Sequence, residues 1–347
     1  MARTLRLFLV RHGETVDNVA QVYAGSLDSE LTNHGFQQAT RLGAHFAAVG
    51  LTFTHIFASP LQRASKTAGK IREAQLTRTS TDTPEARVPD VVHVPLLMEQ
   101  DFGSMEGKKW YDQPPEQKSS GVVSGGRGSK ESMDFVDIES KDSLARRADS
   151  FLDEHLLSLL PENAELPDLV IGIVSHGIFL STLWKRLLKR LEPKSVTLSP
   201  ELQATARPSL EHLGGWSNTG YLELHMTKTS PEEPQPTAGP VPADSSTLLA
   251  KTQVTNKPIG KVEVPQDASS RSDDALQTSP DAQTPVHQGA QDLSRPRIGR
   301  GWSTTILTIN GKDHLKGLKR TGGGVGSSRH DASQKSIETF FKRRKID

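Results

Sequence analysis

The chain has 347 residues, a formal net charge of +1 at neutral pH, no cysteine, 34% hydrophobic residues and 5% aromatic residues. The near-zero charge excludes a polycation that coats nucleic acid or an anionic membrane without specificity. The absence of cysteine excludes disulfide frameworks, thiolate zinc sites and cysteine nucleophiles. The length allows one large or two small domains, and the low apolar content predicts that part of the chain lies outside any packed core.

Apolar runs in the sequence are short. None approaches the roughly 18 consecutive apolar residues that a membrane span needs. The run Leu5 to Val10 lacks a small-residue cleavage site after it, so it predicts neither a secretory signal nor an anchor. We therefore expect a soluble intracellular protein without a membrane partner.

Between Leu5 and about Arg190, short apolar strands alternate with segments of helical period. We expect strands at Leu5 to Val10, Thr54 to Ala58, Val91 to Leu97 and Leu169 to Val174. We expect helices from Thr32 to Gly50, Pro60 to Ile71, about Leu144 to Leu160 and Gly177 to Arg190. This alternation predicts an α/β fold with three layers, a mostly parallel sheet with helices on both faces.

Two stretches interrupt this pattern. Residues 112–140 are rich in Ser, Gly and Lys and predict a long mobile loop. Residues 231–300 contain no aromatic residue and many of the prolines, which predicts a disordered insertion. The strand-like segments Tyr221 to Met226 and Thr304 to Ile309 flank this insertion and are expected to pair. Residues 1–230 and 301–320 would then form one domain, followed by a flexible basic tail at 321–347.

Polar and charged side chains follow four of the predicted strands. Arg11 and His12 follow the first, and His176 follows the strand that ends at Val174. Arg63 lies on the first turn after the second strand, and Glu99 follows the third. The carboxyl ends of parallel strands share one edge of a sheet, so these groups are expected in one crevice. Guanidinium groups match phosphate oxygens and a neutral imidazole is a nucleophile, so the set favours phosphoryl chemistry. We find no metal-ligand set and expect no cofactor.

Five motifs around these residues occur together: RHGET, YAGSLDSELTNHG, SPLQRASKTA, LLMEQDFGSMEG and VSHG. With them, residues 5–226 and a remnant at 304–320 resemble the histidine phosphatase superfamily, which has the phosphoglycerate mutase-like fold. The segment INGKDHLKGL resembles the closing segment of fructose-2,6-bisphosphatase-like and broad-specificity phosphatases. The resemblance therefore implies a phosphorylated small-molecule substrate and favours a sugar phosphate.

The resemblance also implies a role for each site residue. His12 would be transiently phosphorylated, and Glu99 would protonate the leaving oxygen and then deprotonate the attacking water. The phosphoryl group would be clamped by Arg11, Arg63 and His176, and the substrate would be contacted by Asn18, Gly25 and Gly177.

The reaction has two candidate outcomes, net hydrolysis or transfer to a second acceptor as in a mutase. Asp17 stands where many mutases of the histidine phosphatase superfamily carry an aromatic residue. Residues 112–140 lack the paired arginines with which such mutases hold a second phosphorylated product. Both departures favour a phosphatase. They do not identify its substrate.

Some neighbouring residues have competing interpretations. Glu106 is an alternative acid to Glu99, but its greater separation from the strand end favours a solvated loop carboxylate. Arg146 and Arg147 are expected on a solvated helix face. The four tryptophans, Trp110 among them, are expected to be packing residues.

The C-terminal tail carries a separate signal. Gln334, Ile337, Phe340 and Phe341 occupy relative positions 1, 4, 7 and 8, which one helical turn would gather into an apolar plug. This spacing resembles the peptide box that docks on the replication sliding clamp, proliferating cell nuclear antigen. The alternative is a short amphipathic helix that folds back on the domain.

The basic run Lys342 to Lys345 follows the box directly and indicates a nuclear localisation patch, so we expect the protein in nucleus and cytoplasm. No specific nucleic-acid binding is expected. A function of a different class therefore competes with catalysis, namely a nuclear clamp-binding protein that uses the phosphatase fold as a scaffold.

Overall fold

A single sheet organises the computed structural model, which describes residues 3–79, 88–111, 137–160, 168–204, 209–228, 298 and 301–333. The strands described are β1 (Arg3–Arg11), β2 (His55–Ala58), β3 (Val91–His93), β4 (Leu169–Ser175), β5 (Val196–Leu198), β6 (Tyr221–Lys228) and β7 (Trp302–Gly311). Their order is β3-β2-β4-β1-β6-β7-β5. Neighbours pair in parallel, except that β6 runs antiparallel to both β1 and β7. The mostly parallel sheet is confirmed.

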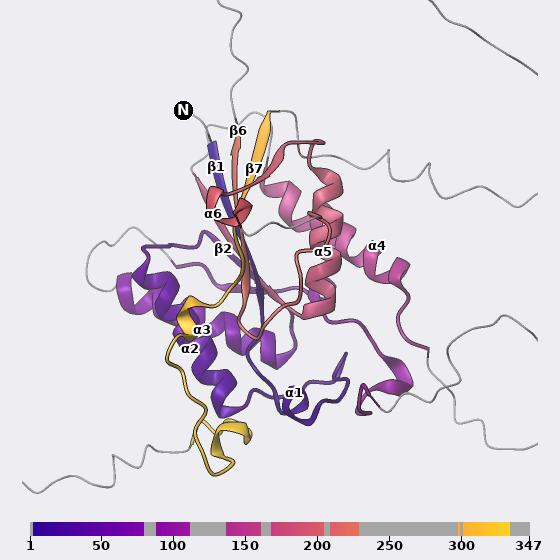
Figure 1. Cartoon of the computed structure of the whole chain (residues 1–347), viewed down its shortest axis with the longest axis vertical. Helices are drawn as coiled ribbons and strands as arrows, with labels where there is room; N and C mark the ends of the chain where they lie inside the picture. Colours follow the sequence, from indigo (N-terminus) through magenta and orange to yellow (C-terminus); the bar gives the residue numbers. More distant parts are fainter. Residues whose placement is uncertain are drawn as a thin grey trace, which may run out of the picture. The chain divides into compact units, whose positions relative to one another are not determined.

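Helices cover both faces of this sheet, as Figure 1 shows. They are α1 (Val16–Ala20), α2 (Asn33–Ala48), α3 (Gln62–Thr79), α4 (Lys141–Phe151), α5 (Gly177–Arg190) and α6 (Pro200–Gln203). The pair α2 and α3 packs on one face, and the pair α4 and α5 packs on the other. The three-layer architecture is therefore confirmed. Within the described ranges, no helix is long and apolar enough to cross a membrane.

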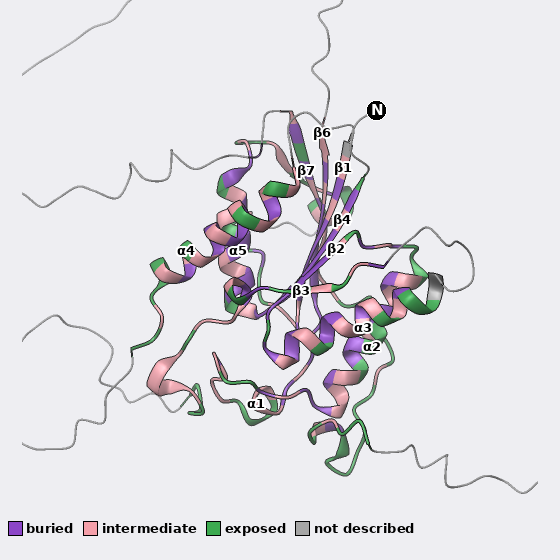
Figure 2. Ribbon diagram, turned by 180° about the vertical axis from the view of Figure 1, so that it is seen from behind, coloured by how far each residue is buried: buried purple, intermediate pink, exposed green. Residues whose placement is uncertain are grey.

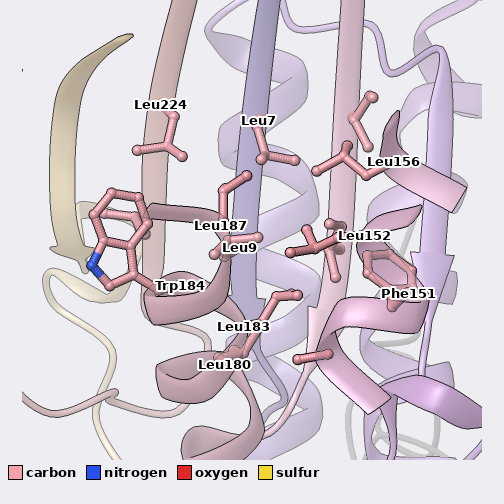
Figure 3. Packing of buried hydrophobic residues seen from close by; sticks show 14 of the residues in the cluster. Leu7, Leu9, Phe151, Leu152, Leu156, Leu180, Leu183, Trp184, Leu187 and Leu224 are labelled. Atoms are coloured by element: carbon pink, nitrogen blue, oxygen red, sulfur yellow. The ribbon is translucent and has the colours of Figure 1, made fainter. Parts of the chain in front are cut away.

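The alternation of side chains along β1 creates the two cores. Leu7 and Leu9 point to the α4 and α5 side, where Leu183 and Phe151 pack near them (Figure 3). Phe8 points to the opposite face and joins the core beneath α2 and α3. Figure 2 shows that the central strands are buried, since their residues are coloured purple between the two helical layers. Burial on both faces explains why β1 reads as a continuous apolar run in the sequence.

Several element boundaries differ from the sequence prediction, among them those of β3, α3 and α4. β3 ends at His93, since Pro95 starts a short 3₁₀ turn, Pro95–Leu97, where a continued strand was expected. α3 continues to Thr79, beyond the expected end at Ile71. α4 begins earlier than expected, at Lys141, because the side chain of Ser140 caps it by accepting a hydrogen bond from the Ser143 amide.

The segments that flank the expected insertion do pair. β6 and β7 run antiparallel, and Lys228 lies opposite Trp302 at the open end of the hairpin. However, Ile298, placed by the sequence prediction inside the disordered stretch, is 4% exposed and belongs to the core on the α5 side. Its amide donates to the carbonyl of Arg190 at 3.0 Å. The expected boundary at residue 300 is therefore wrong, because the chain rejoins the core earlier.

Residues 320–330, which we call the C-terminal strap, also differ from expectation. The Gly-rich part was expected to be flexible, but it contains a 3₁₀ turn, Val325–Ser327, and packs on the start of α2. The amide of Asn33 donates to the carbonyl of Ser328 at 3.0 Å, and the His330 ring stacks on Phe36 with centroids 3.7 Å apart. The tail is thus attached to the domain as far as His330. The candidate clamp box at 334–347, residues 112–136 and most of 231–300 lie outside the described residues.

Candidate active site

Two histidines meet where β1 and β4 end side by side. The strands pair in register as far as Arg11 and Ser175, and the next residue in each chain segment is a histidine. The His12 amide donates to the carbonyl of Ser175 at 3.0 Å, which continues the pairing by one step. The rings of His12 and His176 consequently lie with centroids 5.1 Å apart. The prediction that parallel strand ends bring these imidazoles together agrees with this geometry.

The imidazole of His12 has a defined tautomer. Its Nδ1 lies 2.7 Å from the carbonyl oxygen of Gly13, and since that oxygen can only accept, Nδ1 carries the proton. Nε2 therefore keeps its lone pair. Burial lowers the pKa of His12 well below its ordinary value, and the nearby cations Arg63 and Arg11 lower the pKa further. The ring is thus neutral at physiological pH and has a nucleophilic nitrogen.

Arg63 contacts His176 and lines the same cavity as His12. Its Nε donates to Nδ1 of His176 at 3.1 Å, so the proton of that imidazole is on Nε2, 2.9 Å from the hydroxyl of Ser59. The Nη atoms of Arg63 donate to the carbonyls of Leu27 at 2.6 Å and Gly25 at 2.7 Å. Burial and the charge of Arg63 lower the pKa of His176 well below its ordinary value, so this ring is also neutral.

Arg11 is held less completely. Its Nη1 donates to the carbonyl of Trp216 at 2.6 Å, whereas its Nε is buried without a hydrogen-bond partner among the described residues. A side-chain carbon at Gly177 would lie 3.7 Å from this Nε, which is an ordinary van der Waals distance. A buried N–H without an acceptor is costly, and an anionic oxygen would satisfy it.

The carboxylate of Glu99 lies at the N-terminus of α5. Its oxygens accept from the amides of Ile178 at 3.2 Å and Phe179 at 2.9 Å. The backbone of the Glu99 segment is braced by Arg147, which donates to the carbonyls of Leu96, Met98 and Glu99.

Arg147 also pairs with Glu139 at 2.7 Å and lies over the ring of Phe179. The expectation that Arg147 belongs to a solvated face is therefore wrong, although its neighbour Arg146 is exposed as expected. A helical period alone shows which residues share a face. It does not show that a loop folds over that face and offers carbonyl oxygens.

Glu106 has a different environment from Glu99. Its carboxylate accepts from the Ser26 amide at 2.6 Å and the Ser26 hydroxyl at 3.0 Å. It lies against Gly25, where a side-chain carbon would be 2.1 Å from its Oε1 and where φ is +48°. The residue thus fixes the loop whose Gly25 carbonyl holds Arg63. This contact gives Glu106 a structural task that the sequence did not indicate.

Asn18 is oriented by a residue that the sequence analysis missed. The Oδ1 of Asn18 accepts from the Thr15 amide at 3.2 Å and from Nδ2 of Asn218 at 3.0 Å. The carbonyl of His12 accepts two further hydrogen bonds, from Nδ2 of Asn218 at 3.3 Å and from the backbone amide of Thr219 at 3.1 Å. Asn218 and Thr219 lie in the turn before β6, so only the pairing of β6 with β1 brings them to the site.

A cavity of about 130 Å³ opens beside His12. It is lined by His12, Thr15, Asn18, Val22, Tyr23, Ala24, Gly25, Arg63, Glu99, Phe102, Trp110 and Ile178. Five of the expected site residues therefore line it, while Arg11, His176 and Gly177 lie behind or beside it. Trp110, expected to be a packing residue, is 48% exposed at this cavity instead. Among the described residues, no group of three His, Asp or Glu side chains is placed to hold a metal ion.

Carboxylates outnumber the cations that are described around the cavity. Burial lowers the pKa of Arg63 to about 10, while the carboxylates of Glu99, Asp28, Asp17 and Glu106 oppose this shift. Arg63 therefore remains protonated at neutral pH. Only one guanidinium lines the described cavity, and several carboxylates offset its charge.

Comparisons with known proteins agree with this geometry. The histidine phosphatase superfamily (branch 1) matches residues 7–206. A Schizosaccharomyces pombe protein named as a probable phosphatase is 33% identical over 183 residues, which cover 52% of this chain and 56% of that protein. The match thus spans little more than half the length of this relative.

Two further relatives carry different names. The 2,3-bisphosphoglycerate-dependent phosphoglycerate mutase of Azorhizobium caulinodans is 31% identical over 60% of this chain and 92% of its own. The fructose-2,6-bisphosphatase TIGAR B of Danio rerio is 29% identical over 54% of this chain and 77% of its own. Since the family match covers more than half of the 347 residues, the chain belongs to the histidine phosphatase superfamily.

Proposed function

We propose that the protein is a metal-independent phosphatase that hydrolyses a phosphomonoester through a phosphohistidine at Nε2 of His12. The observation that carries the proposal is the tautomer of His12, because its Nδ1 proton is held by the Gly13 carbonyl and Nε2 is left as a nucleophile. Burial beside two guanidinium groups keeps that ring neutral. A neutral imidazole attacks phosphorus directly, without prior loss of a proton.

The reaction proceeds in two displacements. In the first, Nε2 of His12 forms a bond to phosphorus while the bond from phosphorus to the alcohol oxygen breaks, and Glu99 delivers a proton to that oxygen. A monoanionic phosphomonoester brings this proton into the site. In the second, Glu99 takes a proton from water, the water oxygen attacks the phosphohistidine, and inorganic phosphate leaves neutral His12 behind.

The guanidinium groups supply the electrostatic part of catalysis. The buried Nε of Arg11 lacks an acceptor among the described residues, and each Nη of Arg63 has a second N–H beyond the one given to a backbone carbonyl. These donors match the equatorial oxygens of a transferring phosphoryl group. The neutral His176 holds Arg63 in place through the bond to Nε.

Phosphate release and phosphoenzyme formation test this proposal. Wild type, His12→Ala and the control His93→Ala are incubated in chelator with phosphorylated sugars, glycerates, nucleotides and phosphopeptides. We expect acid-labile phosphate on wild type and on the control, whose imidazole is exposed on β3, and none on His12→Ala. An acid-labile phosphoenzyme on His12→Ala would refute the assignment of the nucleophile.

A mutase is the second candidate, since relatives of comparable similarity are named phosphoglycerate mutases. A mutase must retain the dephosphorylated product and rephosphorylate it at another oxygen. In the described residues, the cavity offers one guanidinium and no further cation for a second acidic group. Labelled phosphate separates the two reactions, because a phosphatase releases the label to water and a mutase transfers it to the second position of the product.

A further part of the proposal concerns the tail. We propose that Gln334, Ile337, Phe340 and Phe341 dock on the replication sliding clamp, and that Lys342 to Lys345 direct part of the protein to the nucleus. The support for both tail assignments is the spacing and charge of these residues in the sequence. The expectation of a sugar phosphate substrate rests likewise on the family resemblance alone. A peptide of residues 330–347 should bind the clamp with a Kd of about 1 μM or tighter, roughly −8 kcal/mol. A Phe340→Ala, Phe341→Ala peptide should not bind.

The alternative of an inactive clamp-binding scaffold has a clear test. A scaffold would bind the clamp without releasing phosphate from any substrate, whereas an enzyme tethered to the clamp does both. Localisation of a fluorescent fusion with and without Lys342 to Lys345 tests the nuclear assignment. Equal distribution of the two fusions would leave that assignment without support.

A further inference from the structure

One wall of the cavity beside His12 is apolar. It is formed by Tyr23, Phe102, Trp110 and Ile178, which come from three separate segments. Tyr23 and Phe102 contact each other with ring centroids 4.6 Å apart. Trp110 and Ile178 remain 48% and 43% exposed, so large apolar side chains face the space that a ligand would fill. Exposed apolar surface of this size within a catalytic cavity is available for burial by a substrate.

Backbone pairing fixes this wall in place. The Trp110 amide donates to the carbonyl of Gln21 at 3.2 Å, and the Tyr23 amide donates to the carbonyl of Lys108 at 2.9 Å. Val22 and Lys109 form an antiparallel bridge between the same two segments. Trp110 is thus carried by a short two-stranded ladder, and its ring is presented to the cavity by ordered backbone.

Several acceptor oxygens of the cavity already receive hydrogen bonds from within the protein. The oxygens of Glu99 accept backbone amides, and Oδ1 of Asn18 accepts two donors. The carbonyl of Gly25 accepts from Arg63, and the hydroxyl of Thr15 accepts from the Asn18 amide. Each of these oxygens therefore has fewer lone pairs left for the hydroxyl groups of a substrate. An apolar group needs no such partner.

The charge of the cavity also restricts the substrate. Arg63 is the one guanidinium in the described lining, and four carboxylates act on it. The ammonium of Lys109, on the ladder beside the cavity, lies over the Tyr111 ring. Among the described lining residues, no further cation is present to pair with a second phosphate or a carboxylate of the substrate, so a substrate with a single acidic group fits this lining better.

We propose that the substrate is the phosphate monoester of an apolar, ring-bearing alcohol with no second acidic group, and that Trp110 determines this preference. The inference rests on the proposed phosphatase function. The phosphate occupies the space at His12, Arg11 and Arg63, and the ring of the alcohol packs between Trp110 and Ile178. This assignment differs from the sugar phosphate that the family resemblance favours, because it rests on the lining residues of this chain.

The test compares phosphomonoesters whose leaving groups are all unactivated alcohols. Values of kcat/KM are measured for 2-phenylethyl phosphate, ethyl phosphate, glucose 6-phosphate, 3-phosphoglycerate and fructose 2,6-bisphosphate. We expect 2-phenylethyl phosphate to exceed each of the others by about tenfold or more, the effect of burying one ring. In Trp110→Ala, kcat/KM should fall more for 2-phenylethyl phosphate than for ethyl phosphate, so that the advantage of the phenylethyl ester decreases to about threefold or less.

Tyr111→Ala is the matched control, since Tyr111 is the next residue, is 57% exposed and does not line the cavity. It should keep the full preference. Equal kcat/KM for the phenylethyl and ethyl esters, a preference for an acidic or sugar substrate, or an equal loss on both esters in Trp110→Ala would overturn the inference.

A binding measurement separates failure of this inference from failure of the proposed function. Benzylphosphonate and ethylphosphonate cannot be hydrolysed, so their Kd values report the cavity without catalysis. We expect wild type to bind benzylphosphonate about tenfold more tightly than ethylphosphonate. Trp110→Ala should not show this difference between the two phosphonates. If no ester is hydrolysed and no phosphohistidine forms, the proposed function fails, and the phosphonates still decide the preference. If hydrolysis occurs without that preference, the inference alone fails.

Discussion

The guanidinium of Arg320 forms an ion pair with the carboxylate of Glu14, two residues after His12, the proposed nucleophile. Arg320 also donates to the hydroxyl of Ser327 at 2.8 Å, and Glu14 accepts from the hydroxyl of Thr32 at 2.8 Å. The ion pair therefore links the C-terminal strap to the loop after β1 and to the start of α2. Residues 306 positions apart in sequence restrain the backbone next to His12.

Removing Arg320 should loosen this restraint. We expect Arg320→Ala to lower the free energy of unfolding by about 1 kcal/mol and kcat by a few-fold, because Glu14 loses a charged donor and the loop at His12 gains freedom. Lys319→Ala, at the neighbouring exposed position, is the control. A double-mutant cycle with Glu14→Gln isolates the pair, and additive effects of the two substitutions would show that the contact has no energetic role.

Glu99 and Glu106 should respond differently to the same substitution. Glu99→Gln removes the acid that protonates the leaving oxygen, so hydrolysis of alkyl phosphates should slow at least about 100-fold, while that of 4-nitrophenyl phosphate slows far less. Glu106→Gln loosens the loop at Ser26 and should slow both substrates by a similar factor. Kinetics on both substrates decide between the residues. A leaving-group dependence in Glu106→Gln alone would reverse the roles.

The strands and the catalytic set were predictable from the sequence because local patterns encode them. The apolar run of β1 and the position of His12 directly after it are sufficient to place that side chain at the edge of the sheet. The same reasoning holds for β4 and His176, and the register of the two strands brings the rings together.

Other parts of the site depend on contacts between distant segments. Asn218 and Thr219 reach the carbonyl of His12 only because β6 pairs with β1, and Thr219 adopts a left-handed backbone with φ of +55° that nothing in its sequence neighbourhood indicates. Trp110 was expected to be a packing residue, but it lines the cavity and is 48% exposed. Its position depends on the ladder with Gln21 and Tyr23, which has no periodic signature.

A buried histidine behind the site should make stability depend on pH. The imidazole of His314 forms a hydrogen bond with the Thr219 hydroxyl at 2.9 Å. Burial lowers the pKa of His314 to about 4. The charges of His45 and Arg41 also lower this pKa, whereas Asp313 raises it. Between about pH 6.5 and 4 the unfolded chain therefore binds a proton that the folded chain does not. The free energy of unfolding should fall as the pH falls through this range.

Denaturant unfolding at pH 6.5, 5.5 and 4.5 checks this expectation. His314→Asn should reduce the pH dependence by up to about 1.4 kcal/mol per pH unit, which is the contribution of one proton. His12 and His176 act in the same direction and remain in the variant, so the slope should shrink without vanishing. His212→Asn, at an exposed position, is the control. An unchanged slope in His314→Asn would show that this imidazole binds its proton over the same pH range in the folded and unfolded states.

The segment between β6 and β7 should be dispensable for catalysis only up to the point where the chain rejoins the core. Lys228 and Trp302 lie opposite each other, so a short connection can replace residues 232–295. We expect this deletion to retain kcat/KM within about twofold and the stability of the full chain, because loop length has a weak effect on folding free energy.

Extending the deletion to residue 300, with a linker that keeps the connection the same length, should have a different result, since it removes Ile298. That side chain is 4% exposed, and its loss should lower the free energy of unfolding by about 2–4 kcal/mol. Ile298→Ala in the full-length chain should reproduce most of this loss without any change in connection. Chemical denaturation and phosphate release are measured on all three variants. If the 232–295 deletion folds but has lost turnover, the segment contributes to the active site. If Ile298→Ala is as stable as wild type, the burial of Ile298 does not contribute to the stability of the core.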